Sequence, residues 1–259
     1  MSDYVLAEKS EGVLTLTLNR PEKKNALTRA MYQALGEAID GAADDAEVRC
    51  VLIQANGDMF TAGNDLADFA AVNAGDPAAK QAQAQGNPLL RALGRAKTPL
   101  VAAVQGRAVG VGVTMLLHCD LVYVAEDALL STPFVNLALL PEAASSLLLP
   151  ARIGHARAFS MFVLGEAIDG RTAAAWGLAN AALPVSQVQA KARTAAQAVA
   201  ARPPASVAIT KALMREPERL AERMEVEGRH FIAQLKSAEA KEAFAAFAEK
   251  RAPDFSKVA

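Results

Sequence analysis

The run from Phe60 to Leu66, Phe-Thr-Ala-Gly-Asn-Asp-Leu, can present unpaired backbone donors. Its glycine follows an expected strand and precedes an expected helix start, where N–H groups lack acceptors within the helix. The backbone N–H of Asn64 lies near that point. The same run is also typical of an ordinary turn in which Asp65 caps a helix, so by itself it leaves both interpretations open.

A second run, Gln105–Val113, contains three glycines at positions 106, 110 and 112. Glycine lets the backbone approach a ligand closely. A helix that starts here directs its N-terminal N–H groups at an anion or oxyanion, and the N–H of Val111 is the natural donor. The alternative is that the glycines serve only tight packing of that helix.

Glu142 is a carboxylate in apolar company, because Leu137–Leu140 and Leu147–Leu149 flank it closely. Such a glutamate is either exposed at a helix start after Pro141 or is a desolvated acid/base with a raised pKa. The sequence around it does not decide between the two.

The histidines and cysteines favour neither a metal site nor a redox centre. His118 and Cys119 are adjacent, whereas His155, His230 and Cys50 stand alone. The sequence contains no CxxC, HExxH or GxSxG motif, and it has neither a dinucleotide fingerprint nor a P-loop. We therefore expect no metal, no nucleophilic serine and no nucleotide cofactor.

Composition narrows the class of protein. The 259 residues carry a net charge of −1 and are 52% hydrophobic, which excludes global disorder and disfavours nucleic-acid binding. No apolar run approaches the length of a membrane span, and Met1–Gly12 does not resemble a signal peptide. Together with the two cysteines, these features lead us to expect a cytoplasmic protein outside the membrane.

The first part of the chain alternates strand and helix patterns. We expect strands over Val13–Leu18, Val48–Gln54, Pro99–Val104 and Asp120–Val124. Thr28 is positioned to cap a helix whose apolar face is Met31, Leu35 and Ile39. The run Met59–Phe69 is expected to lead into another helix, and Leu89–Ala96 is expected to be helical. Short, apolar strands between helices predict an α/β fold with largely buried strands.

After about Ala143 the pattern becomes helical. The expected helical segments are Gly154–Leu164, Thr172–Gly177, Val185–Ala201, Ala205–Met214, Pro217–Leu235 and Ala238–Lys250. We interpret the charged stretch Arg215–Arg229 as a solvated helix face or subunit contact. The predicted division is an α/β core to about residue 195 followed by a helical C-terminal part.

Several segments together resemble one family in order and spacing. They are Leu18–Leu27, Phe60–Leu66, Val104–Asp120, Gly154–Gly165, Ala174–Leu178 and Phe247–Phe255. They resemble the crotonase superfamily, the enoyl-CoA hydratase/isomerase group, over almost the whole chain.

The resemblance implies a spiral of ββα units over residues 1–195, which holds the acyl-CoA site. It also implies an α-helical oligomerisation region over 196–259 that forms a homotrimer or a hexamer made of two trimers. The substrate is then an acyl-CoA thioester, and coenzyme A is part of that substrate rather than a separate cofactor. By position, the thioester oxygen would lie between the backbone N–H groups of Asn64 and Val111.

The resemblance also bears on the reaction. Hydratases of this group use two glutamates, and the corresponding positions here are Thr114 and Phe134. Glu142 falls where Δ3,Δ2-enoyl-CoA isomerases carry their single acid/base, and the surrounding runs look most like the peroxisomal-type monofunctional isomerases. The expected reaction is a 1,3-proton shift through a dienolate, with Glu142 as the catalytic group.

The remaining site residues are also implied by the resemblance. Lys23, Lys24 and Lys250 are candidates for the phosphates of coenzyme A. The other expected substrate-binding positions are Ala26, Ala62, Asp65, Leu66, Gly110 and Phe134. Leu66, Phe69 and Ala71–Pro88 are expected to line the acyl pocket.

Other polar residues near these segments are expected to be structural. Asp65, Asp120, His118 and Cys119 are interpreted in this way, and the serines 145 and 146 as caps of the following helix.

Other functions remain open at this stage. The chain could be a weak hydratase, a dienoyl-CoA isomerase or a pathway-specific acyl-CoA enzyme. It could also bind acyl-CoA without catalysis, since both hydratase glutamates are missing.

Overall fold

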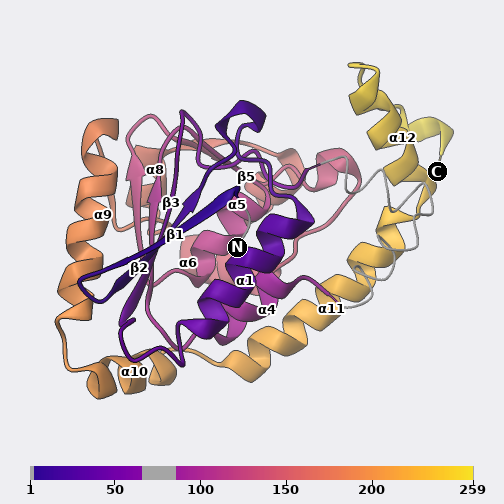
Figure 1. Ribbon diagram of the computed structural model, residues 1–259. Helices are drawn as coiled ribbons and strands as arrows, with labels where there is room; N and C mark the ends of the chain where they lie inside the picture. The colour runs from indigo at the N-terminus through magenta and orange to yellow at the C-terminus, as the bar shows by residue number, and fades with distance from the viewer. Residues whose placement is uncertain (1–2, 66–85, 259) are drawn as a thin grey trace.

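A computed structural model describes residues 3–65 and 86–258. Its centre is a six-stranded sheet with the strand order β1-β2-β3-β4-β6-β9 (Figure 1). The strands are β1 (Val5–Ser10), β2 (Val13–Leu18), β3 (Cys50–Ala55), β4 (Leu100–Val104), β6 (Leu121–Ala125) and β9 (Ala181–Leu183). The first two strands form an antiparallel hairpin, and all later neighbours are parallel.

A second, three-stranded sheet lies beside the first, in the order β5-β7-β8. Its strands are β5 (Arg107–Val109), β7 (Leu129–Ser131) and β8 (Ile168–Asp169). Because β4 is followed directly by β5, the chain passes from one sheet to the other through Gly106. Parallel strands that are covered on both faces have continuous apolar sequences. β4 is an example, because it is buried along its whole length.

Helices cover both sides of the large sheet. α9 (Val185–Ala200) packs on β3, β4 and β6, while α1 (Arg29–Gly41) and α4 (Pro88–Arg95) lie together on the opposite side (Figure 1). The side chain of Thr28 accepts a hydrogen bond from the Met31 N–H, and Met31, Leu35 and Ile39 are buried. The expected cap and apolar face of α1 are therefore confirmed.

Shorter helices connect the strands of the two sheets. They are η1 (Pro21–Lys23), α5 (Val111–Thr114), η2 (Met115–His118), η3 (Val135–Leu137), α6 (Ser145–Ile153), α7 (His155–Phe159), the π-helical η4 (Ser160–Leu164) and α8 (Gly170–Ala175).

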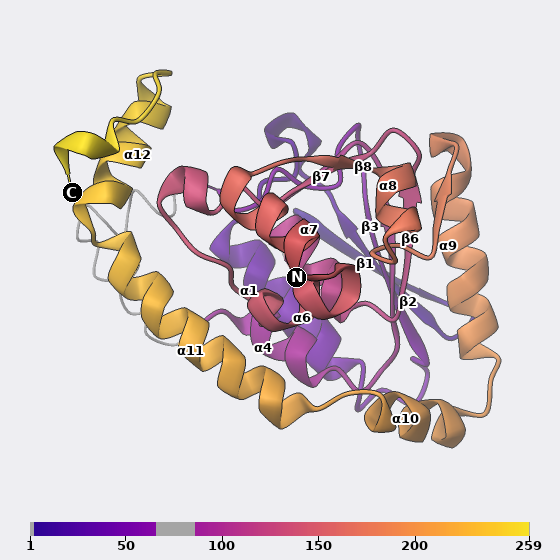
Figure 2. The same cartoon turned by 180° about the vertical axis from the view of Figure 1, so that it is seen from behind.

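The C-terminal helices run around the edge of the molecule. They are α10 (Pro204–Leu213), α11 (Pro217–Leu235), α12 (Ala238–Ala248) and η5 (Phe255–Lys257). In Figure 2, α11 passes beside α4 and leads to α12, which contacts η3. The expected division at residue 195 falls inside α9, which packs on the sheet, and it stays a prediction.

An ion pair between the buried Lys211 and the partly exposed Asp120 attaches this helical part to the core. Lys211 of α10 donates to the Asp120 carboxylate at 2.7 Å and to the Thr98 carbonyl at 2.9 Å. The same carboxylate accepts the Leu100 N–H at 2.7 Å. Removing one partner of such a pair leaves a buried charge unpaired, so Asp120 has the structural role expected for it.

The expected elements agree with the structure where the apolar pattern is long. The strand Val13–Leu18 and the helix Pro217–Leu235 have the predicted bounds. The run Met59–Phe69 was expected to lead into a helix; residues 59–65 form no helix, and residues 66–69 lie outside the described chain, so that expectation stays a prediction. The strands β1, β5, β7, β8 and β9 were not predicted, because each is short or at an edge with few buried positions.

Within residues 3–65 and 86–258, no helix is both long and apolar enough to cross a membrane.

Gly106 offers a test of the passage between the two sheets. It has φ of +62°, and a Cβ atom there would lie 1.8 Å from the carbonyl oxygen of Asp58. We expect Gly106→Ala to lower the free energy of unfolding by about 3 kcal/mol, through backbone strain and overpacking. Urea unfolding followed by circular dichroism measures this.

Gly41→Ala is the matched control, because no atom of the described chain lies within 4 Å of its Cβ position. We expect its stability to stay within about 1 kcal/mol of wild type. Equal stability of the two variants would contradict the tight passage at Gly106.

Candidate active site

Three segments that are distant in sequence lie side by side at one end of the sheets. The Thr61 N–H donates to the Arg107 carbonyl at 3.0 Å, and the Val109 N–H donates to the Thr61 carbonyl at 3.1 Å. The Leu27 N–H donates to the Gly63 carbonyl at 2.8 Å. The two runs singled out for their backbone donors are therefore neighbours.

Close approach between these runs depends on glycine. A Cβ atom at Gly63 would lie 2.9 Å from the Val109 carbonyl oxygen, and Gly63 has φ of +90°. A Cβ at Gly112 would lie 2.5 Å from the methyl group of Thr61. The glycines thus allow tight packing, which was one of the two interpretations. This packing brings together the two turns that present the backbone N–H groups.

Some backbone N–H groups of this layer remain unused. Among the hydrogen bonds of the described residues, neither the Asn64 N–H nor the Val111 N–H has an acceptor. Val111 is the first residue of α5, so its N–H has no acceptor within the helix. The Asn64 side chain is held by the hydroxyl group of Tyr32 on α1. These two groups are available to a carbonyl oxygen.

The carboxyl group of Glu142 reaches the same short helix. The Thr114 hydroxyl donates to Glu142 Oε1 at 2.8 Å, and Thr114 lies one turn after Val111 on α5. Burial raises the pKa of Glu142 to about 7, the charge of Glu227 adds to the rise, and the bond from Thr114 opposes it. A carboxyl group with this pKa can take up and release a proton near neutral pH.

The turn after Glu142 has an unusual backbone. Ala143 has φ of +62° and Ala144 has φ of +55°, a region that residues with a Cβ rarely adopt. Two side chains fix this turn. His118 Nε2 lies 2.7 Å from the Ala143 carbonyl oxygen, and the Glu227 carboxylate accepts the Ala144 N–H at 2.6 Å.

His118 is neutral in this setting. It is buried beside Arg215, and burial followed by that positive charge lowers its pKa to about 3. Arg215 donates to Nδ1 at 3.0 Å, so the proton of the neutral ring is on Nε2 and is donated to the Ala143 carbonyl. The structural role expected for His118 agrees with these contacts.

The apolar ring of Phe134 is buried beside the site. It is 6% exposed, and its ring centroid lies 6.1 Å from that of Phe162. One ring carbon lies 3.8 Å from the position of a Cβ at Gly110, next to the turn that presents the Val111 N–H. Position 134 therefore carries no carboxylate that could activate water.

The comparisons with known proteins bear on this arrangement. A family model described as enoyl-CoA hydratase/isomerase matches residues 8–258. The chain belongs to the enoyl-CoA hydratase/isomerase family. Its fold also matches the crystal structure of a family member from Pseudoalteromonas atlantica T6c, with a TM-score of 0.90, 43% identity, and coverage of 98% of this chain and 100% of that one.

Curated relatives of this enoyl-CoA hydratase/isomerase family member carry different names. The enoyl-CoA delta isomerase 2 of Rattus norvegicus is 36% identical over 84% of this chain, which spans 56% of the length of the rat protein. The 1,2-epoxyphenylacetyl-CoA isomerase of Escherichia coli K12 is 31% identical over 98% of this chain and 99% of its own length. The family is therefore established, whereas the names of relatives do not select one reaction.

Some of the other predicted site residues have defined contacts. The Asp65 carboxylate accepts a hydrogen bond from Arg20 at 2.6 Å, and the same guanidinium group donates to the Ala26 carbonyl at 3.1 Å. The Ala62 N–H donates to the Lys24 carbonyl at 2.9 Å. Asp65 thus binds an arginine, which fits the structural role expected for it, and Leu66 lies outside the described residues.

The three lysines predicted to bind coenzyme A are all exposed. Lys24 lies 2.8 Å from the Asp58 carboxylate, and both side chains are accessible to solvent. Lys23 ends η1 and Lys250 follows α12. Binding of phosphate groups by these lysines stays a prediction. Phe69 and most of the expected acyl-pocket segment, residues 66–85, lie outside the described chain.

The capping role expected for the two serines is wrong. Ala144 precedes α6 without a side-chain cap, and the buried Ser145 hydroxyl has no hydrogen-bond partner among the described residues. The Ser146 hydroxyl instead donates to Glu227 at 2.5 Å. The carboxylate that accepts hydrogen bonds from N–H groups at the start of α6 thus belongs to Glu227 of α11.

Glu227 is the residue that the sequence analysis missed. The stretch Arg215–Arg229 was interpreted as a solvated face or subunit contact, but Glu227 is 5% exposed. Its burial could have been recognised from the sequence, because Glu227 shares one helix face with the apolar residues Leu220, Met224 and Leu235.

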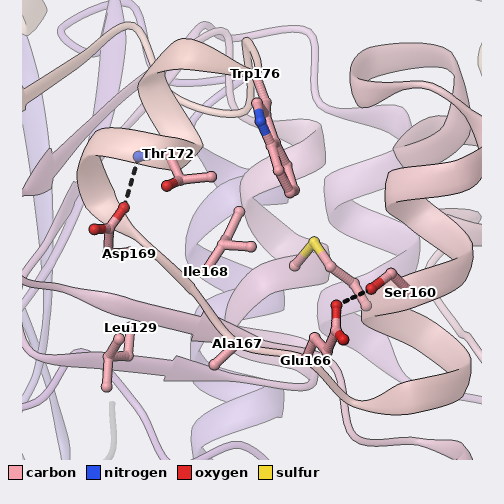
Figure 3. A pocket seen from close by; sticks show the side chains of 9 residues that line it. Leu129, Ser160, Glu166, Ala167, Ile168, Asp169, Thr172 and Trp176 are labelled. Atoms are coloured by element: carbon pink, nitrogen blue, oxygen red, sulfur yellow. Dashed lines mark hydrogen bonds between the residues drawn. The ribbon is translucent and has the colours of Figure 1, made fainter.

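A surface hollow of about 440 Å³ lies elsewhere, between β7, β8 and α8 (Figure 3). Its acidic groups already have partners, since Glu166 accepts from the Ser160 hydroxyl and Asp169 accepts from the Thr172 N–H. None of the predicted site residues lines it. The hollow is therefore separate from the chemistry described above.

The raised pKa of Glu142 makes stability depend on pH. The folded chain binds the proton more tightly than an unfolded carboxyl of pKa 4.5, so this stabilisation is complete below pH 4.5 and is lost as the pH rises through about 7. Glu142→Gln stays neutral and can still accept the Thr114 bond. We expect it to unfold like wild type at about pH 4 and to gain about 2 kcal/mol at about pH 8.

Urea unfolding of both proteins at the two pH values measures this difference. A gain of the same size at both values would show that Glu142 titrates as an ordinary exposed carboxyl.

Proposed function

We propose that the chain is a Δ3-to-Δ2 enoyl-CoA isomerase in which Glu142 moves one proton within the acyl chain. One observation carries the proposal: the partly buried Glu142 carboxyl is held by Thr114, one helical turn from the free N–H of Val111. A group able to exchange protons therefore lies beside a group able to bind an enolate oxygen.

The reaction begins when the thioester oxygen of a 3-enoyl-CoA accepts hydrogen bonds from the Asn64 and Val111 N–H groups. Glu142 removes a proton from C2, and the electrons of that C–H bond form a dienolate whose charge rests on the oxygen. Donors fixed in advance strengthen their bonds as this charge develops, each contributing about 3 kcal/mol. The protonated Glu142 then returns the proton to C4, and the double bond lies between C2 and C3.

The pKa of Glu142 suits both halves of this sequence. At about 7, a substantial fraction is ionised at neutral pH and can act as the base. The same pKa makes the ionised group a stronger base than an ordinary carboxylate, while its protonated form can still give the proton back. One residue can therefore serve as base and then as acid, which a 1,3-shift requires.

Hydration is disfavoured by the side chains at the two positions where related hydratases carry glutamates. The Thr114 hydroxyl is engaged in its bond to Glu142, and the buried Phe134 ring offers no acceptor for water. A dry site also limits loss of the proton held by Glu142.

The relatives and the surface support further parts of the proposal. The rat protein is named an enoyl-CoA delta isomerase. Coenzyme A enters as part of the substrate, and no other cofactor takes part. For assembly as a homotrimer or a dimer of trimers, α10 and its end offer exposed apolar side chains at Ile209, Leu213 and Met214.

The test is an assay of purified protein with a medium-chain 3-enoyl-CoA and, separately, a 2-enoyl-CoA, with products resolved by chromatography. We expect conversion of the 3-enoyl to the 2-enoyl thioester with little 3-hydroxyacyl-CoA. Glu142→Gln keeps the shape but cannot accept the proton, so its kcat should fall by about 10³-fold.

The control is Glu225→Gln, which makes the same change at an exposed site on α11 and should retain wild-type activity. Rapid formation of 3-hydroxyacyl-CoA that survives Glu142→Gln would refute the isomerase. Binding of both thioesters without turnover would favour a non-catalytic acyl-CoA-binding protein or a different acyl group.

A further inference from the structure

Glu227 of α11 binds the turn that carries Glu142. Its carboxylate accepts the Ala144 N–H at 2.6 Å, the Ser146 N–H at 3.0 Å and the Ser146 hydroxyl at 2.5 Å. These donors lie two to four residues after Glu142, whereas Glu227 is more than 80 residues away in sequence. The carboxylate is thus a tertiary cap on α6.

The turn needs such an acceptor. Ala143 and Ala144 are both left-handed, and Ala144 supplies no cap of its own to α6. Helix starts leave N–H groups unpaired, and a buried one must find an acceptor. Without the Glu227 carboxylate, the N–H groups of Ala144 and Ser146 lose their acceptor and the left-handed turn loses one of its two supports.

The second support does not depend on Glu227. The Nε2–H of His118 on η2 is donated to the Ala143 carbonyl, and Arg215 binds the other ring nitrogen. Because Arg215 lies two residues before the start of α11, both supports are linked to the C-terminal helices.

The charged and titratable groups around the two glutamates are few in the described chain. Glu142 faces the Thr114 hydroxyl from α5 and the carboxylate of Glu227 from α11. Burial raises the pKa of Glu227, and the hydrogen bonds from Ser146 and Ala144 together with the charge of Arg223 oppose that rise. His118 stays neutral. Arg152 donates to the Leu117 carbonyl, and Arg215 donates to the His118 carbonyl.

We propose that Glu227 is a positioning residue, whose buried carboxylate holds the left-handed turn that places Glu142 at the reaction centre. This role rests on the isomerase function proposed above. It makes α11 part of the active-site machinery, in addition to any part it has in assembly.

The test compares Glu227→Gln with two other variants. Glutamine keeps the size of the side chain but presents an amide N–H₂ where one backbone N–H needs an acceptor, and it removes the negative charge near Glu142. We expect kcat to fall by about tenfold or more with KM nearly unchanged, because a misplaced base affects the chemical step. The exposed Glu225→Gln on the same helix is the control and should change neither value.

The pH profile separates positioning from a general loss of structure. Activity requires ionised Glu142, so kcat/KM falls below its pKa. Removing the Glu227 charge lowers that pKa, whereas Thr114→Val removes a hydrogen bond to the ionised form and raises it. We therefore expect the acid limb to move to lower pH in Glu227→Gln and to higher pH in Thr114→Val, each by about half a unit or more.

Wild-type kcat with an unmoved acid limb in Glu227→Gln would overturn the proposal. So would a loss of kcat without movement of the limb, since that is what a purely structural role produces. If Glu227→Gln does not fold, Glu227→Asp replaces it, because it keeps the charge and withdraws the carboxylate by one methylene. Wild-type kcat in a folded Glu227→Asp would equally overturn the proposal.

A second readout does not need turnover. The carbonyl stretch of the protonated Glu142 carboxyl, identified in infrared spectra by its absence in Glu142→Gln, reports its pKa directly. A lower pKa in Glu227→Gln supports the positioning role, and an unchanged one contradicts it. Lack of isomerase activity in the wild type would refute the proposed function alone, because this measurement still stands.

Discussion

The carboxyl group of Glu142 is kept partly out of water, and much of the site follows from that constraint. Burial disfavours the ionised form and brings its pKa to about 7. A group in this state must be held by contacts that do not fully stabilise its charge. Thr114 donates one hydrogen bond to it, while Glu227 lies near enough to oppose ionisation. The balance of burial, one donor and one like charge sets the proton affinity that a single acid/base needs.

Holding this group requires elements from the whole chain. The crossing at Gly106 sends the chain from the large sheet to the small one and places the Gly63 turn against Val109. The unused N–H groups therefore come from the Gly63 turn and from the start of α5, whereas the turn of Glu142 is supported by η2 and α11. The C-terminal helices thus hold the turn that carries Glu142 through the carboxylate of Glu227.

The sequence predicted the parts of the fold that repeat a simple pattern. The strand Val13–Leu18 and the helix Pro217–Leu235 have long apolar periods, and Glu142 was recognisable from its apolar neighbours and from the family resemblance. Glu227 was not, because its partners are backbone N–H groups more than 80 residues away, and a glutamate in a charged helix usually faces solvent. The left-handed turn after Glu142 was equally hidden, since alanine gives no local signal for a positive φ.

The central claim is that one shielded carboxyl, Glu142, carries the proton from C2 to C4. Isomerisation of a 3-enoyl-CoA in D₂O, with analysis of hydrogen and deuterium at C4 of the earliest product, tests it directly. If Glu142 keeps the proton between the two steps, part of the product retains protium at C4, and this retention disappears with the activity in Glu142→Gln. One full deuterium at C4 in every product molecule from the first turnovers, with a rate that survives Glu142→Gln, would show that solvent supplies the proton and would contradict the account.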